Sequence, residues 1–386
     1  MRAIETTRVA VLVDTCTAWG RRLNRGILSY AERHGPWNVW VEPRGTSEKL
    51  RVPEGWFGHG VIARISSKAM GEHLRQLRLP IINVSGIRIP DVDFPRVSIN
   101  SDAFAHLAVS HFLDRGLRNI AYVGLYARAY SMDRQEALAR ACNDLGCAFQ
   151  VYHHVPESSS NGRWRKGRDR LGDWIVSLPK PVGILAWAVR RGGDVIEEAM
   201  QRGFRVPEDV AVLGDDDEVL CGSVQPPLSG VVLPSEQIGL EAAAMLDRLM
   251  QGKKPPQQEV LVAPTGIVSR ASTDVLAIDD QEVIEAVRMI RGNVSKPLTV
   301  QEVTDSLAIS RRSLERRFQH ALQRTMGDEI ARIHLERAKF LLATTDMPIP
   351  TVAESSGYGS PEYLSRVMKR RTGLTPRQYR AQRQGR

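Results

Sequence analysis

The chain has 386 residues, 42% of them apolar and 25% charged, with a formal net charge of +9. This composition is typical of a globular protein of two or three domains and excludes a disordered chain or a fibre. The start "MRAIETTRVAVLVD" passes into a strand without a signal segment, and no run approaches the roughly 20 apolar residues that span a bilayer. We therefore expect a cytoplasmic protein with no membrane partner.

Short runs rich in Val and Ile alternate with helical stretches through the first 270 residues. These runs are "RVAVLVD", "NVWVEP", "GVIARI", "PIINVS", "NIAYVG", "VGILAW" and "VAVLG". Strands that alternate with helices predict parallel sheets covered by helices. The runs fall into two groups, one before about residue 110 and one from Asn119 to Gly214, and a helix and two further strands follow. We expect two α/β lobes joined by a hinge.

After "GIVSRASTDVLAIDDQEV" the pattern becomes wholly helical. "TVQE", residues 299–302, predicts a capping box, and Ser310 predicts the cap of the helix "RRSLERRFQHAL". A second pair of short helices follows, with a turn at Gly357 and a helix capped by Ser360. Two short helices joined by a tight turn predict a helix-turn-helix unit, here twice. The helix between them, "DEIARIHLERAKFLLATTD", is amphipathic and should pack against both units.

The positive charge belongs to this helical region. From Gln281 onward there are 19 Lys+Arg against 11 Asp+Glu, and the first 280 residues hold 34 against 33. Such asymmetry is typical of a polyanion-binding module joined to a neutral one. Acidic lipid is the weaker interpretation, because no long basic amphipathic helix with an aromatic face occurs.

Other chemistry is poorly supported. The cysteines, Cys16, Cys142, Cys147 and Cys221, form no CxxC pair, and no Cys/His cluster has zinc spacing, so we expect buried thiols and no metal. Nucleotide-binding glycine motifs and GxSxG are absent, so no cofactor and no catalytic residue is predicted. The run from Asp215 to Asp217 remains open as an acid/base cluster, a ligand contact or a solvated turn.

Four segments resemble the effector-binding domain of LacI/GalR-type repressors, which are relatives of periplasmic sugar-binding proteins. They are "NSDAFAHLAVSHFLDRGLRNIAYVG", "DRQEALARACNDLG", "GFRVPEDVAVLGDDDE" and "LSGVVLPSEQIGLEAAAMLDRLMQG". The resemblance covers about residues 8 to 270. It implies a sugar held between two lobes by arginine donors, carboxylate acceptors and an aromatic face.

The same resemblance implies ligand residues. Asp216 matches the family's ligand aspartate and Arg134 its ligand arginine. Trp19 and Arg21 follow the first strand, where family members place ring-covering and polar contacts. The alternative interpretations are a core position for Trp19 and a surface charge for Arg21.

The pattern departs from this family in two places. Ala188 and Val189 stand where the family commonly has Asn-Asp, so the identity of the sugar is open and an apolar or deoxygenated edge is expected there. The family also keeps its DNA-binding helices ahead of the first strand, where this chain has seven residues.

The basic helices resemble AraC/XylS-type DNA-binding domains over about residues 283 to 383. The matching segments are "SRRSLERRF", "ERAKFLLATT" and "VAESSGYGSPEYLSRVMKRRTGLTPRQYR", which ends in GxTPxxYR. The resemblance implies major-groove base contacts from both recognition helices. These base-reading residues would be Arg312, Glu315, Arg316, Glu362, Tyr363 and Arg366. The remaining basic residues of the two helices should contact phosphate or water, namely Arg311, Arg317, Lys369, Arg370 and Arg371.

A LacI-like sensor followed by an AraC-like reader is the order found in xylose-operon regulators of the XylR type. This resemblance implies an α/β two-lobed periplasmic-binding-protein-like domain followed by an all-α domain with two helix-turn-helix units. We expect an effector domain at residues 1–272, a linker at 273–282 and a DNA-binding domain at 283–386. The implied function is a sugar-responsive transcription regulator for xylose or a related monosaccharide. It would be an activator and a homodimer on an operator with paired half-sites, with RNA polymerase a candidate partner.

Two enzyme classes remain as alternatives. A DNA-repair alkyltransferase also carries an AraC-type domain, but it needs an activated cysteine, and no cysteine here has an adjacent histidine or basic neighbourhood. A carbohydrate-active enzyme with an incidental tail would not require two complete recognition helices.

Overall fold

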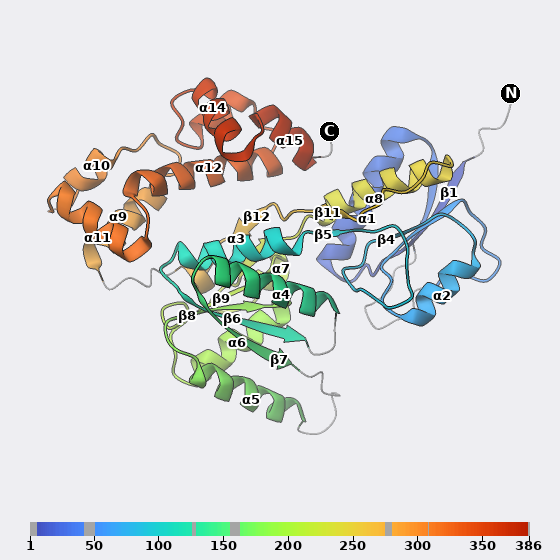
Figure 1. Ribbon diagram of the computed structural model, residues 1–386, viewed down its shortest axis with the longest axis horizontal. Helices are drawn as coiled ribbons and strands as arrows, with labels where there is room; N and C mark the ends of the chain where they lie inside the picture. The colour runs from blue at the N-terminus through green and yellow to red at the C-terminus, as the bar shows by residue number, and fades with distance from the viewer. Residues whose placement is uncertain are drawn as a thin grey trace.

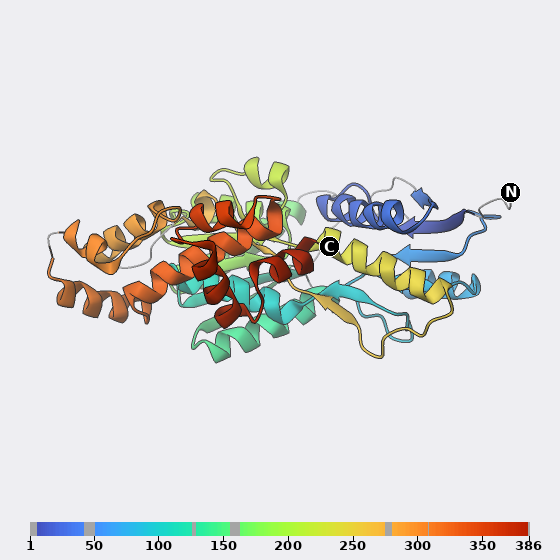
Figure 2. The same ribbon diagram turned by 90° about the horizontal axis from the view of Figure 1, so that it is seen from above.

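The computed structural model describes most of the chain as two α/β lobes followed by an all-helical region (Figure 1). The described residues are 6–41, 51–125, 129–154, 163–274, 280–307 and 309–384. Figures 1 and 2 place the N-terminal lobe at one end of the long axis and helices α9 to α11 at the other. The second lobe lies between them.

The N-terminal lobe is built on a parallel sheet of order β2-β1-β3-β4. Its strands are β1 (Thr7–Leu12), β2 (Trp37–Val41), β3 (Gly60–Ala63) and β4 (Ile81–Asn83). Alternate residues of β1 face opposite layers, since Val9 and Val11 pack with α1 (Ala18–His34) and α8 (Ser235–Met250), and Ala10 packs with α2 (Lys68–Gln76).

Helices α1 and α8 cross at two glycines. A Cβ atom at Gly26 would lie 2.0 Å from the carbonyl oxygen of Glu236, and one at Gly239 would lie 2.1 Å from that of Leu23. The two backbones therefore touch, and only glycine fits at either position.

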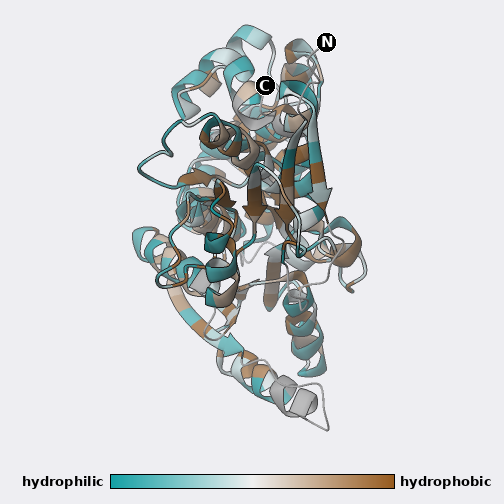
Figure 3. Ribbon diagram, turned by 90° about the vertical axis from the view of Figure 1, so that its right-hand side faces the viewer, coloured by the Kyte–Doolittle hydropathy of each residue, from teal (hydrophilic) through white to brown (hydrophobic). Residues whose placement is uncertain are grey.

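The second lobe contains a six-stranded sheet of order β12-β10-β9-β8-β6-β7, in which only β12 is antiparallel to its neighbour. Its strands are β6 (Asn119–Leu125), β7 (Ala148–His154), β8 (Val182–Ala186), β9 (Val210–Asp215), β10 (Ser229–Val232) and β12 (Gly266–Val268). Helices α3 (Ser101–Leu113) and α4 (Ala129–Asp144) cover one face. Helices α5 (Arg163–Ser177) and α6 (Val189–Gln201) cover the other, and α7 (Glu218–Gly222) follows β9. Figure 3 shows the most hydrophobic stretches on the strands.

The lobes are joined where β5 (Val97–Ile99) pairs with β11 (Val260–Val262). The chain crosses between the lobes after β5, after β10 and after β11. The predicted pair of α/β lobes with a hinge is therefore confirmed.

The helical region consists of two helix-turn-helix units on one long helix. Its helices are α9 (Gln281–Gly292), α10 (Val300–Asp305), α11 (Arg311–Leu322), α12 (Met326–Thr344), α13 (Ile349–Glu354), α14 (Pro361–Thr372) and α15 (Pro376–Gln384). We call α10–α11 the first unit and α13–α14 the second unit. Met326 and Ile330 of α12 belong to the core of the first unit, and Leu341 and Leu342 to that of the second. The predicted packing of this helix against both units is confirmed.

The predicted caps are also present. Thr299 and Glu302 form the capping box of α10, Ser310 caps α11, and Ser360 accepts a hydrogen bond from the backbone of α14. Gly357 has φ of +73°, which permits the turn of the second unit. None of the described helices is long and apolar enough to cross a membrane.

Candidate functional site

A cleft of about 600 Å³ lies between the two lobes. The start of α1, the loop after β4, the start of α3 and the end of β9 all contribute side chains to it. Carboxyl ends of parallel strands are where open α/β sheets bind ligands, because the loops there diverge and leave a crevice.

Asp216 follows β9 and lines this cleft, with 10% of its side chain exposed. A guanidinium nitrogen of Arg270 lies 2.9 Å from Oδ1, but outside hydrogen-bonding geometry, so Oδ1 is a buried acceptor without a protein donor. Arg22 lies 3.9 Å from Oδ2 and donates to the backbone oxygen of Asp216 at 3.2 Å. The carboxylate is thus held by two cations and keeps one acceptor unsatisfied.

Arg134 reaches the same part of the cleft from α4. Its Nη1 donates to Oδ1 of Asp215 at 3.0 Å, and its guanidinium lies 4.1 Å from the ring centroid of Phe104. Burial raises the pKa of the Asp215 carboxyl, although Arg134 acts in the opposite direction. The structure therefore brings Arg134 and Asp216 together, with Asp215 as a further acceptor.

Trp19 lines the cleft and also packs against the core of the N-terminal lobe, and its contact with a sugar ring stays a prediction. The guanidinium of Arg64 lies 5.2 Å from its ring, and Arg64 pairs with Asp14 at 2.7 Å. An indole held in this way presents an aromatic surface at the cleft wall.

Arg21 is exposed and does not line the cleft. Its Nη1 donates to the backbone oxygens of Thr15 at 3.1 Å and Cys16 at 2.8 Å. Arg22, the next residue, is the α1 arginine that lines the cleft. The predicted residue Arg21 thus lies outside the cleft lining, next to a residue that lies within it.

Most charged residues of the cleft were missed by sequence reasoning. Its cations are Arg22, Arg64, Arg88, Arg96, Arg134, Arg140 and Arg190. Its acidic residues are Asp102, Asp133, Glu136, Asp215, Asp216, Asp217 and Glu259. Over the described part of the chain the two sets are equal in number. Arg88 joins the lobes by pairing with Glu259 at 2.7 Å and Asp133 at 3.5 Å. The only sequence signal for these residues is that several follow strand ends.

Ala188 and Val189 form an apolar part of the cleft wall at the start of α6. Ala188 is the N-cap residue and makes no side-chain capping bond, and Val189 is buried. The departure from the family's polar pair therefore lies within the cleft itself.

Three of the four cysteines have thiols with a raised pKa, which is the opposite of activation. Burial raises the pKa of Cys142 to about 12 and also raises the pKa of Cys147 and of Cys221. Cys16 lies at the cleft and is exposed, so the expectation of a buried thiol is wrong for this residue. Over the described ranges, no group of His, Cys, Asp and Glu could hold a metal ion.

In the first unit, Arg312 and Arg316 of α11 are exposed, while Leu314 and Phe318 are buried in the core. Glu315 accepts from Nε of Arg311 at 2.9 Å and has 44% of its side chain exposed. The predicted base-reading residues thus share an open face of the helix.

In the second unit, Glu362, Tyr363 and Arg366 of α14 are exposed. Tyr363 is 48% exposed, and the guanidinium of Arg366 lies 5.2 Å from its ring centroid. Both recognition helices present their predicted residues outward, and the base contacts themselves stay a prediction.

Arg317 corrects an expectation. It donates to both carboxylate oxygens of Asp280, and its Nη2 also lies 2.6 Å from Glu282. Both acids belong to the start of α9, where Asp280 is the N-cap residue. Arg317 therefore attaches α11 to α9 instead of remaining open for phosphate.

Comparisons with known proteins agree with this architecture. Residues 109–273 match the family of periplasmic binding protein-like domains, and residues 303–382 match a helix-turn-helix domain family. The chain is 29% identical over 383 residues to the xylose operon regulatory protein of Escherichia coli K12, covering 97% of this chain and 96% of the relative. It is 28% identical over 387 residues to the protein of the same name from Haemophilus influenzae, covering 97% and 98%.

A solved structure of a xylose-binding transcription activator, XylR, aligns with a TM-score of 0.63 at 28% identity and covers 98% of both chains. Both domains and their order agree along nearly the whole length. The chain therefore belongs to the XylR-type regulators, and it is a sugar-sensing AraC-type transcription regulator and not an enzyme.

Proposed function

We propose that this regulator activates a sugar-utilisation operon and that its effector is xylose or a related pentose. The relatives support this sugar class, because they are named for the xylose operon and for xylose binding. In this proposal the regulator acts in the cytoplasm.

The observation that carries the proposal is the balanced charge of the cleft. Among the residues that the structure describes, seven arginines and seven acidic side chains line it, so this part of the lining offers many donors and acceptors and carries as many cations as anions. A neutral polyhydroxylated ligand satisfies such a site, because each hydroxyl can both donate and accept. An anionic sugar would leave the acidic half of the lining unfavourably placed.

In this site Asp216 accepts from a sugar hydroxyl, and Arg134 donates to another. Trp19 covers the ring, and Ala188 and Val189 contact an edge that carries no hydroxyl. Arg22 replaces Arg21 as the polar contact from α1. These roles are supported by the positions of the side chains along the cleft.

The reader acts as part of a homodimer on paired half-sites, with RNA polymerase as the further partner. We place the sensor at residues 1–272, the linker at 273–282 and the reader at 283–386. Two outward-facing recognition helices in each chain support the DNA-binding part of the proposal. Sugar binding would favour one arrangement of the lobes, and it can act on DNA only if the two arrangements differ in sugar affinity.

The test is a thermal-shift screen of the full chain against xylose, arabinose, ribose, glucose and glucuronate. A sugar at 100 times its dissociation constant adds about 2.7 kcal/mol of stability, which a melting curve resolves. Asp216→Asn should weaken binding about 10-fold, because a charged hydrogen bond is worth about 1.5 to 3 kcal/mol. Asp144→Asn, which changes an exposed carboxylate at the end of α4, is the control. A shift with glucuronate alone, or with no pentose, would contradict the proposal.

A further inference from the structure

A group of charges, with two buried carboxylates and three partly exposed arginines, joins the second lobe to the helices that pack around the first unit. We call it the junction cluster; its members are Asp114, Arg291, Arg324, Glu329 and Arg332. Asp114 comes from the C-cap of α3, and the other four come from α9, α12 and the turn before α12.

Asp114 contacts three members of this cluster from the sensor domain. Its Oδ1 lies 2.8 Å from Nη1 of Arg324, and its Oδ2 lies 2.5 Å from Nη1 of Arg332. Its backbone oxygen accepts from Nη2 of Arg291 at 3.0 Å. One residue of the sensor domain therefore holds three arginines of the reader.

Glu329, which belongs to the reader, fixes the positions of Arg324 and Arg332. It accepts two hydrogen bonds from Arg332, at 2.8 and 2.9 Å, and lies 2.6 Å from Nε of Arg324. Glu329 is 0% exposed and Asp114 is 8% exposed. Removal of one member of a buried ion pair is costly, because it leaves the partner's charge uncompensated.

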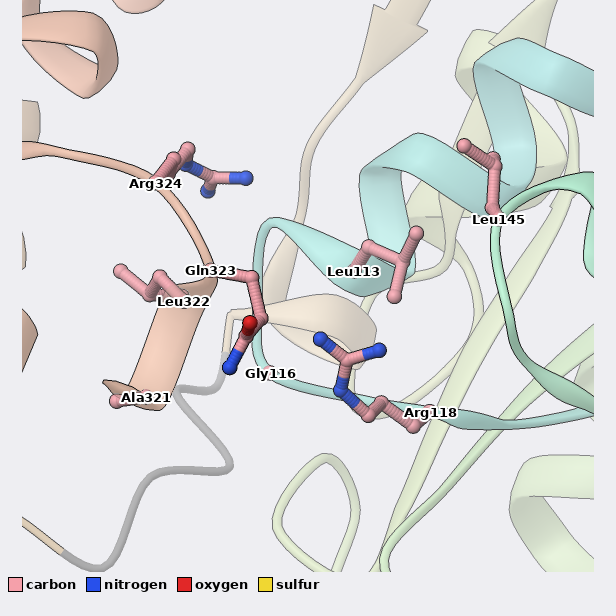
Figure 4. A pocket seen from close by; sticks show the side chains of 8 residues that line it. All are labelled: Leu113, Gly116, Arg118, Leu145, Ala321, Leu322, Gln323 and Arg324. Atoms are coloured by element: carbon pink, nitrogen blue, oxygen red, sulfur yellow. The ribbon is translucent and has the colours of Figure 1, made fainter. Parts of the chain in front are cut away.

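The apolar packing around the cluster is incomplete. A cavity of about 230 Å³ separates Leu113 and Leu145 of the sensor from Leu322 of the reader. Figure 4 shows Arg324 and the end of α11 facing the end of α3 across this space. Charged contacts, more than apolar burial, therefore hold the two domains together here.

Helix α3 connects this cluster to the cleft. Asn100 caps its first turn, and Asn100, Ser101 and Asp102 line the cleft. Asp114 ends the helix, which at 1.5 Å per residue spans about 20 Å. Phe104 and other apolar residues of α3 are fully buried, so the helix moves as one body with its sheet.

The end of α3 also holds the segment that leads to the reader. Arg115 donates to the backbone oxygen of Thr273 at 2.5 Å and to Oγ of Ser269 at 3.0 Å. The covalent connection and the junction cluster thus meet at the same end of one helix.

We propose that Asp114 is an interdomain latch, which fixes the first helix-turn-helix unit against the sensor and transmits the state of the cleft through α3. The effector part of this inference rests on the function proposed above. When the latch is removed, the cleft still binds sugar and the reader still binds DNA, but the two events are uncoupled.

The test measures how much xylose changes the affinity for a DNA duplex that the wild-type chain selects from a random pool. Full-length wild type is compared with Asp114→Asn, Arg332→Gln and the double variant. Asp144→Asn is again the matched control, because it removes an exposed charge from the same lobe. The second measurement is the hydrogen exchange of the α12 amides in the full chain. It needs neither sugar nor DNA.

We expect xylose to change the affinity of wild type and Asp144→Asn by the same factor, about 5 or more. In both latch variants this factor should fall below about 2, while xylose still raises the melting temperature. The double variant should lose less than the sum of the two single losses, because both changes break the Asp114–Arg332 pair. The first turns of α12 should exchange faster in Asp114→Asn.

The latch would be refuted if xylose changed the DNA affinity of Asp114→Asn by the same factor as that of wild type. It would also be refuted if the hydrogen exchange of the α12 amides were the same in both chains. A wild-type chain that responds neither to xylose nor to another pentose would instead contradict the proposed function. In that case hydrogen exchange alone tests the latch. Faster exchange of the α12 amides in Asp114→Asn supports it, and unchanged exchange refutes it.

Discussion

His111 lies in the last turn of α3 and is 8% exposed. Nη1 of Arg115 lies 3.2 Å from its Nδ1, and since a guanidinium only donates, Nδ1 must accept. Nε2 therefore carries the hydrogen that is donated to Oγ1 of Thr273 at 2.9 Å. Burial lowers the pKa of His111 well below 6.5, and the charges of Arg115, Arg291 and Arg332 lower it further.

The imidazole is thus neutral in the folded chain, whereas in the unfolded chain it takes up a proton as the pH falls below about 6.5. The unfolded state then binds more protons than the folded state. The free energy of unfolding therefore decreases as the pH is lowered, by at most about 1.36 kcal/mol per pH unit. For an imidazole that stays neutral when folded, the loss between about pH 7.5 and about pH 5.5 is about 1.4 kcal/mol.

His111→Gln tests this, because the amide can still accept from Arg115 and donate to Thr273 but does not titrate. His106→Gln, an exposed position on the same helix, is the control. Urea unfolding of the full chain at both pH values should show a loss about 1.4 kcal/mol smaller in His111→Gln than in wild type or the control. Equal losses in all three chains would refute the assignment of a neutral imidazole.

Two further predictions concern the reader. Arg316→Ala should relax base preference at one operator position, at a cost of about 1 to 3 kcal/mol, while Arg371→Ala weakens binding almost equally on all sequences. Selection from a random DNA pool checks both, and an unchanged motif for Arg316→Ala would refute its role as a base reader. Arg317→Gln should lower the melting temperature of the chain and leave the selected motif unchanged, because it removes the contacts of α11 with Asp280 and Glu282. A changed motif at unaltered stability would show that Arg317 contacts DNA.

Much of the fold could be predicted from local pattern. Val- and Ile-rich strands between helices predicted both lobes, and Thr299, Ser310 and Ser360 predicted where the reader helices begin. These signals are short-range, since a cap or a buried strand is decided by the residues next to it.

The rest depends on how the elements are placed. Arg21 and Arg22 are adjacent, and about 100° of helix rotation separates their side chains, so only the packing of α1 decides which one enters the cleft. The partners of Arg317 lie 35 and 37 residues away. Asp114 meets Arg324 and Arg332 only because the sensor and the reader lie side by side, and no sequence spacing encodes that contact.

The crossing of α1 and α8 at Gly26 and Gly239 affects how genetic screens of this regulator should be interpreted. Helix α1 carries Trp19 and Arg22 into the cleft, and α8 begins at its wall. A single added methyl group at either glycine would overlap a backbone oxygen of the facing helix and displace both walls. Random mutagenesis will therefore score these two positions as loss of sugar response. Neither glycine lines the cleft, so a genetic map of effector sites based on phenotype alone would extend well beyond the residues that touch the sugar.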